Sequence, residues 1–145
     1  MNLHTATIKC LNNYFNFNGR AKRAEYWYFT AFNLLAFFCI VMLENLFDLN
    51  LWWLSTIVGV GYMIPYFAVG ARRLHDVGKS GWLQVLPIIF QVLPIIFAWI
   101  GDFIPISEAF LIFMAVLYIG STIYLLFLFI CESEKKNNKY GPVPK

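Results

Sequence analysis

Four long stretches without charge constrain this chain more than any other feature of its sequence. They run from about Tyr26 to Leu43, Leu51 to Ala71, Trp82 to Ile100 and Ala109 to Cys131, and none contains Asp, Glu, Lys or Arg. A charge at the bilayer centre costs about 2.5–3.5 kcal/mol on the insertion scale, so a chain that crosses lipid keeps its charges between the crossing segments. As helices rising about 1.5 Å per residue, these stretches are long enough to cross a hydrocarbon core of about 30 Å.

The composition agrees with this interpretation. Only 13% of the residues are charged and 60% are hydrophobic, whereas a soluble domain carries about 25% charged residues. Membrane-spanning strands would be about 10 residues long with strict alternation, and no such pattern is present. The sequence therefore predicts an all-α, polytopic membrane protein with four transmembrane helices, forming a single membrane domain over residues 1–145.

The distribution of Lys and Arg predicts the orientation. All eleven lie in residues 1–25, 72–81 and 132–145. The charged residues of the intervening loops, 44–50 and 101–108, are all acidic. Because Lys and Arg near membrane ends stay on the cytoplasmic side, we expect both termini to be cytoplasmic and the protein to lie in the bacterial cytoplasmic (inner) membrane. The tryptophans all fall near expected helix ends, where indole prefers to lie: Trp27, Trp52, Trp53, Trp82 and Trp99.

A short helix is expected before the first spanning segment. Ile8, Leu11 and Phe15 recur at spacings of three and four, with Lys9 and asparagines between them. This spacing predicts a short N-terminal amphipathic helix in the cytoplasmic interface, the alternative being a disordered polar terminus.

The third spanning segment contains a tandem repeat, QVLPIIF at 84–90 and again at 91–97. Seven residues return nearly to the same helical face, so Gln84 and Gln91 should stack, as should Pro87 and Pro94. One interpretation is a polar stripe that lines a path in an oligomer. We favour the other, in which the glutamines form hydrogen bonds across helices.

Two cytoplasmic segments carry most of the polar chemistry. They lie before the first spanning helix and between the second and third, and they supply a candidate polar site made of Arg20, Arg23, Glu25, Arg72, Arg73, His75, Asp76, Lys79 and Ser80. We expect the arginines and the two carboxylates to converge in a network that clamps the helix ends. In the second segment, Gly78 and Gly81 permit positive backbone dihedrals, and Asp76 and Ser80 suit a tight turn.

The same segments give little support to other chemistry. Adjacent residues such as His75 and Asp76 rarely orient each other as a dyad, and no nucleophile has an evident activating partner. Two histidines and three widely spaced cysteines do not form a metal motif. We therefore expect no catalytic, cofactor-binding or metal-binding residues, and a net charge of +3 gives no reason to expect nucleic acid binding.

The resulting functional hypothesis is a non-enzymatic module whose basic cytoplasmic face binds a partner protein or anionic lipid headgroups. Clusters of basic residues just inside a membrane attract acidic headgroups. Two alternatives stay open: an oligomeric channel or transport component, and a membrane enzyme that acts on lipid headgroups. A homo-oligomer is compatible with the first of these.

Three motifs resemble the YhaH/YhaI-type bacterial inner-membrane family, a group defined by a domain of unknown function. They are FNFNGRAKRAEYW near the start, ARRLHDVGKSGW in the centre and NNKYGPVP at the end. The resemblance implies a small multi-helix protein of the bacterial cytoplasmic membrane and supplies no activity. The matching positions are Gly19, Arg20, Arg23, Glu25, Trp27, Arg72, Arg73, His75, Asp76, Gly78, Ser80, Gly81 and Trp82.

The predicted orientation has a direct test. A reporter fused after residue 78 should be cytoplasmic, so a fluorescent-protein fusion there should fluoresce and an alkaline phosphatase fusion should be inactive. Paired fusions in the 101–108 loop serve as the control and should give the opposite result. Active phosphatase after residue 78 would contradict the orientation.

Overall fold

A computed structural model describes residues 2–47, 52–100 and 107–144, and this part of the chain is helical apart from its connections and tail. The elements are α1 (Leu3–Asn12), α2 (Arg23–Leu46), α3 (Trp52–Asp76), the 3-10 helix η1 (Gly81–Gln84), α4 (Val85–Ile100) and α5 (Glu108–Ile130). α2, α3, α5 and the continuous stretch of η1 with α4 are each long and apolar enough to cross a membrane. The prediction of an all-α, four-span membrane protein is confirmed.

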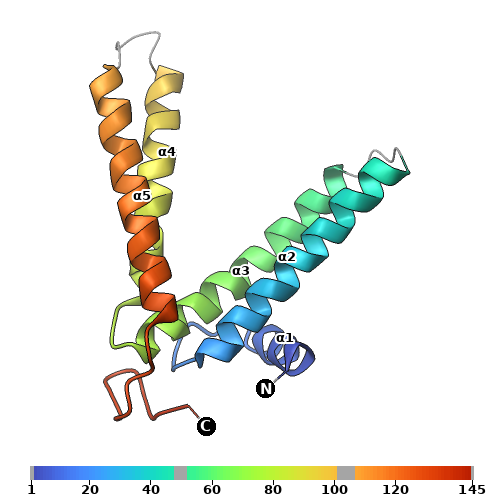
Figure 1. Cartoon of the computed structure of the whole chain (residues 1–145), viewed down its shortest axis with the longest axis vertical. Coiled ribbons are helices and arrows are strands. Elements are labelled where there is room, and N and C mark those ends of the chain that lie inside the picture. The colour runs from blue at the N-terminus through green and yellow to red at the C-terminus, as the bar shows by residue number, and fades with distance from the viewer. Residues whose placement is uncertain (1, 48–51, 101–106, 145) are drawn as a thin grey trace.

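The spanning helices form two hairpins that diverge from a common base (Figure 1). α2 packs along α3, and α4 packs along α5. The hairpins meet through contacts of α5 with α2 and α3, while α1 packs beneath the first hairpin. Both termini lie at the base (Figure 1), which is also the end that carries the basic segments.

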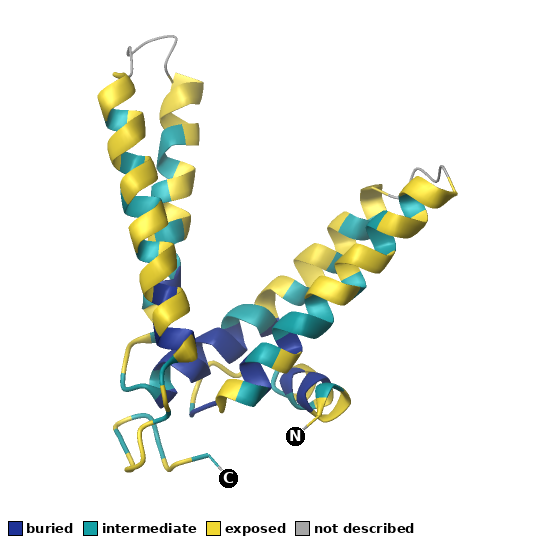
Figure 2. Ribbon diagram, viewed as in Figure 1, coloured by how far each residue is buried: buried dark blue, intermediate teal, exposed yellow. Residues whose placement is uncertain are grey.

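The buried core is confined to this base (Figure 2). Tyr26 and Phe29 of α2, Val69 and Leu74 of α3, and Phe129 of α5 form the centre of one apolar cluster. The ring of Tyr26 stacks on that of Phe129 at a centroid distance of 4.3 Å. Farther out, the arms expose large apolar side chains along their length, a surface that suits hydrocarbon and would be untenable in water.

α3 is longer than the sequence predicts. The expected segment ends at Ala71, whereas the helix continues through Arg72 and Arg73 to Asp76. The expectation that these residues belong to a loop is wrong. The side chains of Arg72 and Arg73 form ion pairs inside the base. The helix can therefore continue through these charged residues.

The N-terminal helix is confirmed, although it ends at Asn12, before Phe15. Its Ala6, Thr7 and Cys10 are buried, because this face packs against α2. Ile8 and Leu11 are exposed. The apolar spacing that predicts the helix therefore marks the face that points away from the protein, as an interfacial helix requires.

A proline in α3 is compensated from outside its own helix. Pro65 lies inside α3 and has no N–H, so the carbonyl of Gly61, four residues earlier, loses its helical donor. Tyr14 follows α1 in the chain, and its hydroxyl donates to the Gly61 carbonyl. An otherwise unpaired carbonyl in an apolar region is satisfied in this way.

The two copies of the heptad repeat have different environments. Gln84 lies in η1 and is buried, and its Nε2 donates to the carbonyl of Phe67 in α3 at 3.2 Å. Gln91 is exposed in α4. The predicted cross-helix hydrogen bond is thus confirmed for Gln84, but the repeat does not form one continuous glutamine stripe, because its first residue belongs to a 3-10 turn.

Two glycines allow η1 to approach α3. A Cβ on Gly70 would lie 2.1 Å from Oε1 of Gln84, and one on Gly81 would lie 2.7 Å from the Cβ of Ala71. The expectation of a positive dihedral holds at Gly78, whose φ is 73°. Gly81 is required for space instead.

Substitution of Gly81 by Ala should weaken this junction. The added Cβ would also lie 3.1 Å from the Cα of Ala71, so backbone would have to shift, which costs about 1–3 kcal/mol of unfolding free energy. The measurement is unfolding in mixed micelles. The control is Gly120→Ala in α5, where a Cβ meets nothing within 4 Å. Equal stability of the two variants would contradict the packing described.

Candidate polar site at the base

A buried carboxylate joins two arginines at the base. The Oδ1 of Asp76 lies 2.9 Å from Nη2 of Arg20, and its Oδ2 lies 2.5 Å from Nη1 of Arg73. Nε of Arg20 also donates to Oδ1 at 2.9 Å. All three side chains are at most 1% exposed. A planar guanidinium suits such a contact, because it directs several donors at one carboxylate.

Arg20 also holds the C-terminal tail. Its Nη1 donates to the carbonyl of Lys136 at 2.8 Å, and its Nη2 donates to the carbonyl of Glu134 at 2.6 Å. The backbone N–H of Glu134 donates to the Asp76 carbonyl at 3.0 Å. The segment before α2, the end of α3 and the tail are therefore joined around one side chain.

Two arginines bind the end of α5. Nε of Arg73 donates to the Phe129 carbonyl at 3.3 Å, and its Nη2 donates to the carbonyl of Cys131. Nη1 of Arg23 donates to the Ile130 carbonyl at 3.2 Å. The last carbonyls of a helix lack donors and carry partial negative charge, so these contacts attach the second hairpin to the first.

A second ion-pair cluster surrounds Glu25. Its Oε2 lies 2.6 Å from Nζ of Lys9, and its Oε1 lies 3.0 Å from Nη1 of Arg72. Glu25 is fully buried and Arg72 is 4% exposed. Among the described residues, Nε and Nη2 of Arg72 have no hydrogen-bond partner. The balance of charge around Arg72 thus depends on Glu25.

Cys10 lies against this cluster. Burial, and secondly the charge of Glu25, raises the pKa of the Cys10 thiol to about 12. The thiol is therefore neutral at physiological pH, a state in which cysteine is a poor nucleophile. Its position beneath α2 suits a packing role.

His75 contacts both the segment before α2 and the C-terminal tail. Its Nδ1 lies 3.1 Å from the Gly19 carbonyl, and its ring stacks on Tyr140 with a centroid distance of 3.8 Å and an interplanar angle of 7°. Nδ2 of Asn138 donates to the backbone carbonyl of His75 at 2.9 Å. The imidazole thus forms part of the surface on which the tail docks.

The structure brings together only part of the predicted site. Arg20, Arg73 and Asp76 share one cluster, and Glu25 and Arg72 share the other. Of the four other residues, His75 is half-buried, while Arg23, Lys79 and Ser80 are exposed. Asp76 bonds to arginines and does not close a turn as expected. Ser80 does cap η1, since its side chain accepts from the backbone N–H of Trp82.

Several participants were missed from the sequence. They are Lys9 and Cys10 in α1 together with Glu134, Lys136, Asn138 and Tyr140 in the tail. The tail residues Asn138 and Tyr140 belong to the NNKYGPVP motif, which was available as a signal. The three motifs meet in space at the base. This contact explains why a short polar tail belongs to the family pattern together with the two arginine-rich segments.

The fold and this site define a class: a multi-pass α-helical membrane protein whose hairpins meet at one end, where an arginine held by a buried ion pair binds the last carbonyls of α5. Among the described residues, no three His, Cys, Asp or Glu side chains are grouped so that they could hold a metal ion. The chain belongs to the family described as "Protein of unknown function (DUF805)", whose model matches residues 14–142.

Two relatives from Escherichia coli (strain K12) carry names that place them in a membrane. The inner membrane protein YhaI is 33% identical over 138 residues, covering 95% of this chain and 93% of the relative. The inner membrane protein YhaH is 37% identical over 101 residues, covering 62% of this chain and 80% of the relative. No solved structure matches. The resemblance seen in the three motifs is confirmed. The prediction of a multi-pass membrane protein with inner-membrane relatives is confirmed as well.

The Glu25 cluster predicts unequal costs for its two partners. Glu25→Gln leaves Arg72 buried without a counter-charge and should cost about 3–5 kcal/mol of unfolding free energy. Arg72→Met should cost less, because Glu25 retains Lys9, and the double variant should recover most of the loss from Glu25→Gln. Unfolding in mixed micelles measures all three.

Lys135→Gln is the control, since Lys135 is exposed and should change stability by less than about 0.5 kcal/mol. Additive losses in the double variant would show that Glu25 and Arg72 do not depend on each other.

Proposed function

We propose that this chain is a non-enzymatic inner-membrane module that binds anionic phospholipid at its basic end, with that end and both termini in the cytoplasm. One observation carries the proposal. A surface pocket of about 330 Å³ lies where α2 begins, and it is lined by Arg23, Ala24, Trp27, Tyr28 and Ile130. Arginine recognises phosphate oxygens, while Trp and Tyr favour the headgroup level.

The basic residues fall into two groups, one buried in ion pairs and one exposed at the surface. Arg20, Arg72 and Arg73 are buried in ion pairs, so they offer little charge to a lipid surface. Other basic side chains are exposed around the same base: Lys22, Arg23, Lys79, Lys135, Lys136 and Lys139. Each basic residue close to an anionic leaflet contributes about 1 kcal/mol of attraction.

The charge distribution supports the cytoplasmic leaflet as the site of binding. All eleven Lys and Arg lie in the three segments of the basic end, together with four acidic residues. The positive-inside rule assigns such an end to the cytoplasm, where the leaflet surface is negative. Orientation and lipid binding thus depend on the same charges.

The alternatives receive less support from the contacts. The Gln84 amide is bonded to the Phe67 carbonyl, which removes it from a channel lining. Both oxygens of Asp76 face arginines, so this carboxylate is not free to act as a base. Nδ1 of His75 faces the Gly19 carbonyl, which leaves Nε2 as the nitrogen of that ring able to accept a proton. An enzyme would still be detected as lipid-headgroup turnover that requires His75 or Asp76.

Arg23→Gln should weaken binding of phosphatidylglycerol about fivefold, the factor that corresponds to 1 kcal/mol. The measurement is native mass spectrometry of the detergent-solubilised protein titrated with phosphatidylglycerol, with phosphatidylcholine as the zwitterionic reference. Arg23→Lys keeps the charge and should lose less. Arg23→Gln combined with Lys22→Gln and Lys79→Gln should lose more than the single variant.

Two results would overturn the proposal. Equal affinity for phosphatidylglycerol and phosphatidylcholine would remove the preference for anionic lipid, and an unchanged affinity in all variants would remove this site. A stoichiometric protein that remains bound while lipid exchanges freely would favour the partner-protein alternative.

A further inference from the structure

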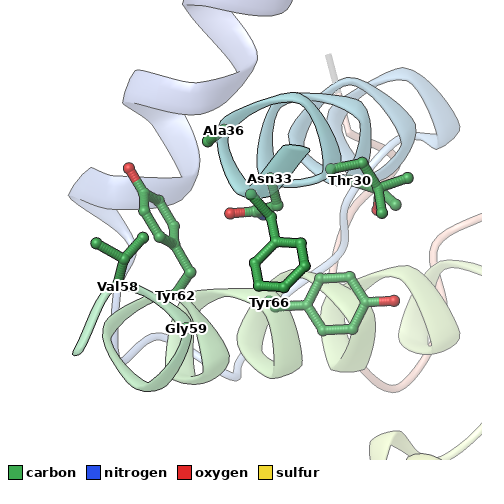
Figure 3. Close-up of a pocket in the computed structure, with 9 residues that line it drawn as sticks. Thr30, Asn33, Ala36, Val58, Gly59, Tyr62 and Tyr66 are labelled. Atoms are coloured by element: carbon green, nitrogen blue, oxygen red, sulfur yellow. The ribbon is translucent and has the colours of Figure 1, made fainter. Parts of the chain in front are cut away.

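A groove runs between the middle parts of α2 and α3 in the first hairpin (Figure 3). Its volume is about 300 Å³. α2 contributes Thr30, Asn33 and Phe37 to its walls, and α3 contributes Gly59, Tyr62 and Tyr66. A Cβ on Gly59 would meet nothing within 4 Å, so the groove is open at this point.

The groove continues the contact between the hairpins. Asn33 and Phe37 follow Tyr26 by seven and eleven residues, which returns them to nearly the same face of α2. Tyr26 uses this face to stack on Phe129 of α5, and its hydroxyl lies 3.1 Å from that of Tyr66. Beyond this contact the hairpins diverge (Figure 1), so the groove faces the space between them.

Asn33 brings an unsatisfied acceptor to the groove. Its Nδ2 donates to the Phe29 carbonyl at 3.0 Å, which fixes the orientation of the amide. Its Oδ1 is buried and has no hydrogen-bond partner among the described residues. In an apolar surrounding, an unpaired carbonyl oxygen carries a free-energy cost. An occupant of the groove that donates a hydrogen bond to this oxygen would remove that cost.

A matching donor lies on the other hairpin. Gln91 is exposed on α4, and no hydrogen bond of its side chain joins it to the rest of the described chain. The spans that contain Asn33 and Gln91 begin at Arg23 and Gly81, so each amide lies ten residues from the basic end of its span. Their depths in the membrane are therefore similar.

We propose that the groove is a self-association site that takes α4 of a second copy of this chain. The Gln91 amide of that copy donates to Oδ1 of Asn33, and Gly59 lets the helices approach closely, as small residues do in membranes. With two-fold symmetry the exchange is reciprocal, and each copy fills the open side of the other. This self-association does not depend on the proposed lipid binding.

Cross-linking between differently tagged copies tests the geometry. Chains with Cys39 and Cys131 replaced by Ser carry either Asn33→Cys with one tag or Gln91→Cys with another, and they are co-expressed and oxidised in membranes. A disulfide-linked species carrying both tags is expected. Pairing Asn33→Cys with Leu93→Cys, a half-buried position on α4, is the control and should give no such species.

Two outcomes would overturn the proposal. One is the absence of any two-tag species, as expected if lipid fills the groove. The other is a disulfide formed only within single chains that carry both Asn33→Cys and Gln91→Cys, which would mean that the two hairpins of one molecule close on each other.

Energy transfer between labelled copies in liposomes tests the amide contact. Asn33→Leu and Gln91→Leu should each weaken self-association about three- to tenfold, and the double variant should be no weaker than the more affected single variant. Gly59→Leu fills the groove and should also weaken it, while thermal unfolding of the monomer in detergent stays unchanged. Undiminished association in all of these variants, or multiplied losses in the double variant, would contradict the contact.

Discussion

The whole arrangement depends on the carboxylate of Asp76, which Arg20 and Arg73 share away from water. Its two oxygens are 2.9 and 2.5 Å from the guanidinium groups. Ions lose several kcal/mol of hydration when they are buried and recover it only if their partners are in place together. Because Arg20 precedes α2 and Asp76 ends α3, the first hairpin must close before this carboxylate is satisfied. The bonds of Arg73 to the Phe129 and Cys131 carbonyls then bring in α5.

Lipid explains why the packing is concentrated there. Hydrocarbon is as apolar as leucine, so helices inside it gain little from burying apolar side chains against one another. Most backbone hydrogen bonds of each arm lie within its own helices, with the Gly61 carbonyl accepting from Tyr14 instead. Large apolar side chains remain exposed along both hairpins. The polar base supplies what the arms lack, namely contacts that have one correct geometry. The specificity of the fold thus arises where water and lipid meet.

Sequence reasoning predicted what depends on local composition. Charge-free length predicted the four spans, and spacing predicted α1. It ended the second span at Ala71 because it counted Arg72 and Arg73 as exposed charges, whereas tertiary partners keep them helical and buried. Glu25 and Asp76 were recognised as partners for arginines. Lys9 was not, because its contact with Glu25 depends on how α1 packs beneath α2, and no residue spacing encodes that.

The buried arginines also change how the charge of such a chain should be counted. A rule based on sequence weighs Arg20, Arg72 and Arg73 equally with Arg23, yet the first three face carboxylates, while Arg23 remains exposed. During insertion, before the hairpins pack, all of them are available to influence the topology. After folding, the three buried ones are screened by their partners, and the surface of the base presents chiefly Arg23 and the exposed lysines. The same residue type therefore either contributes to packing or stays on the surface of the base, according to whether a carboxylate lies within reach.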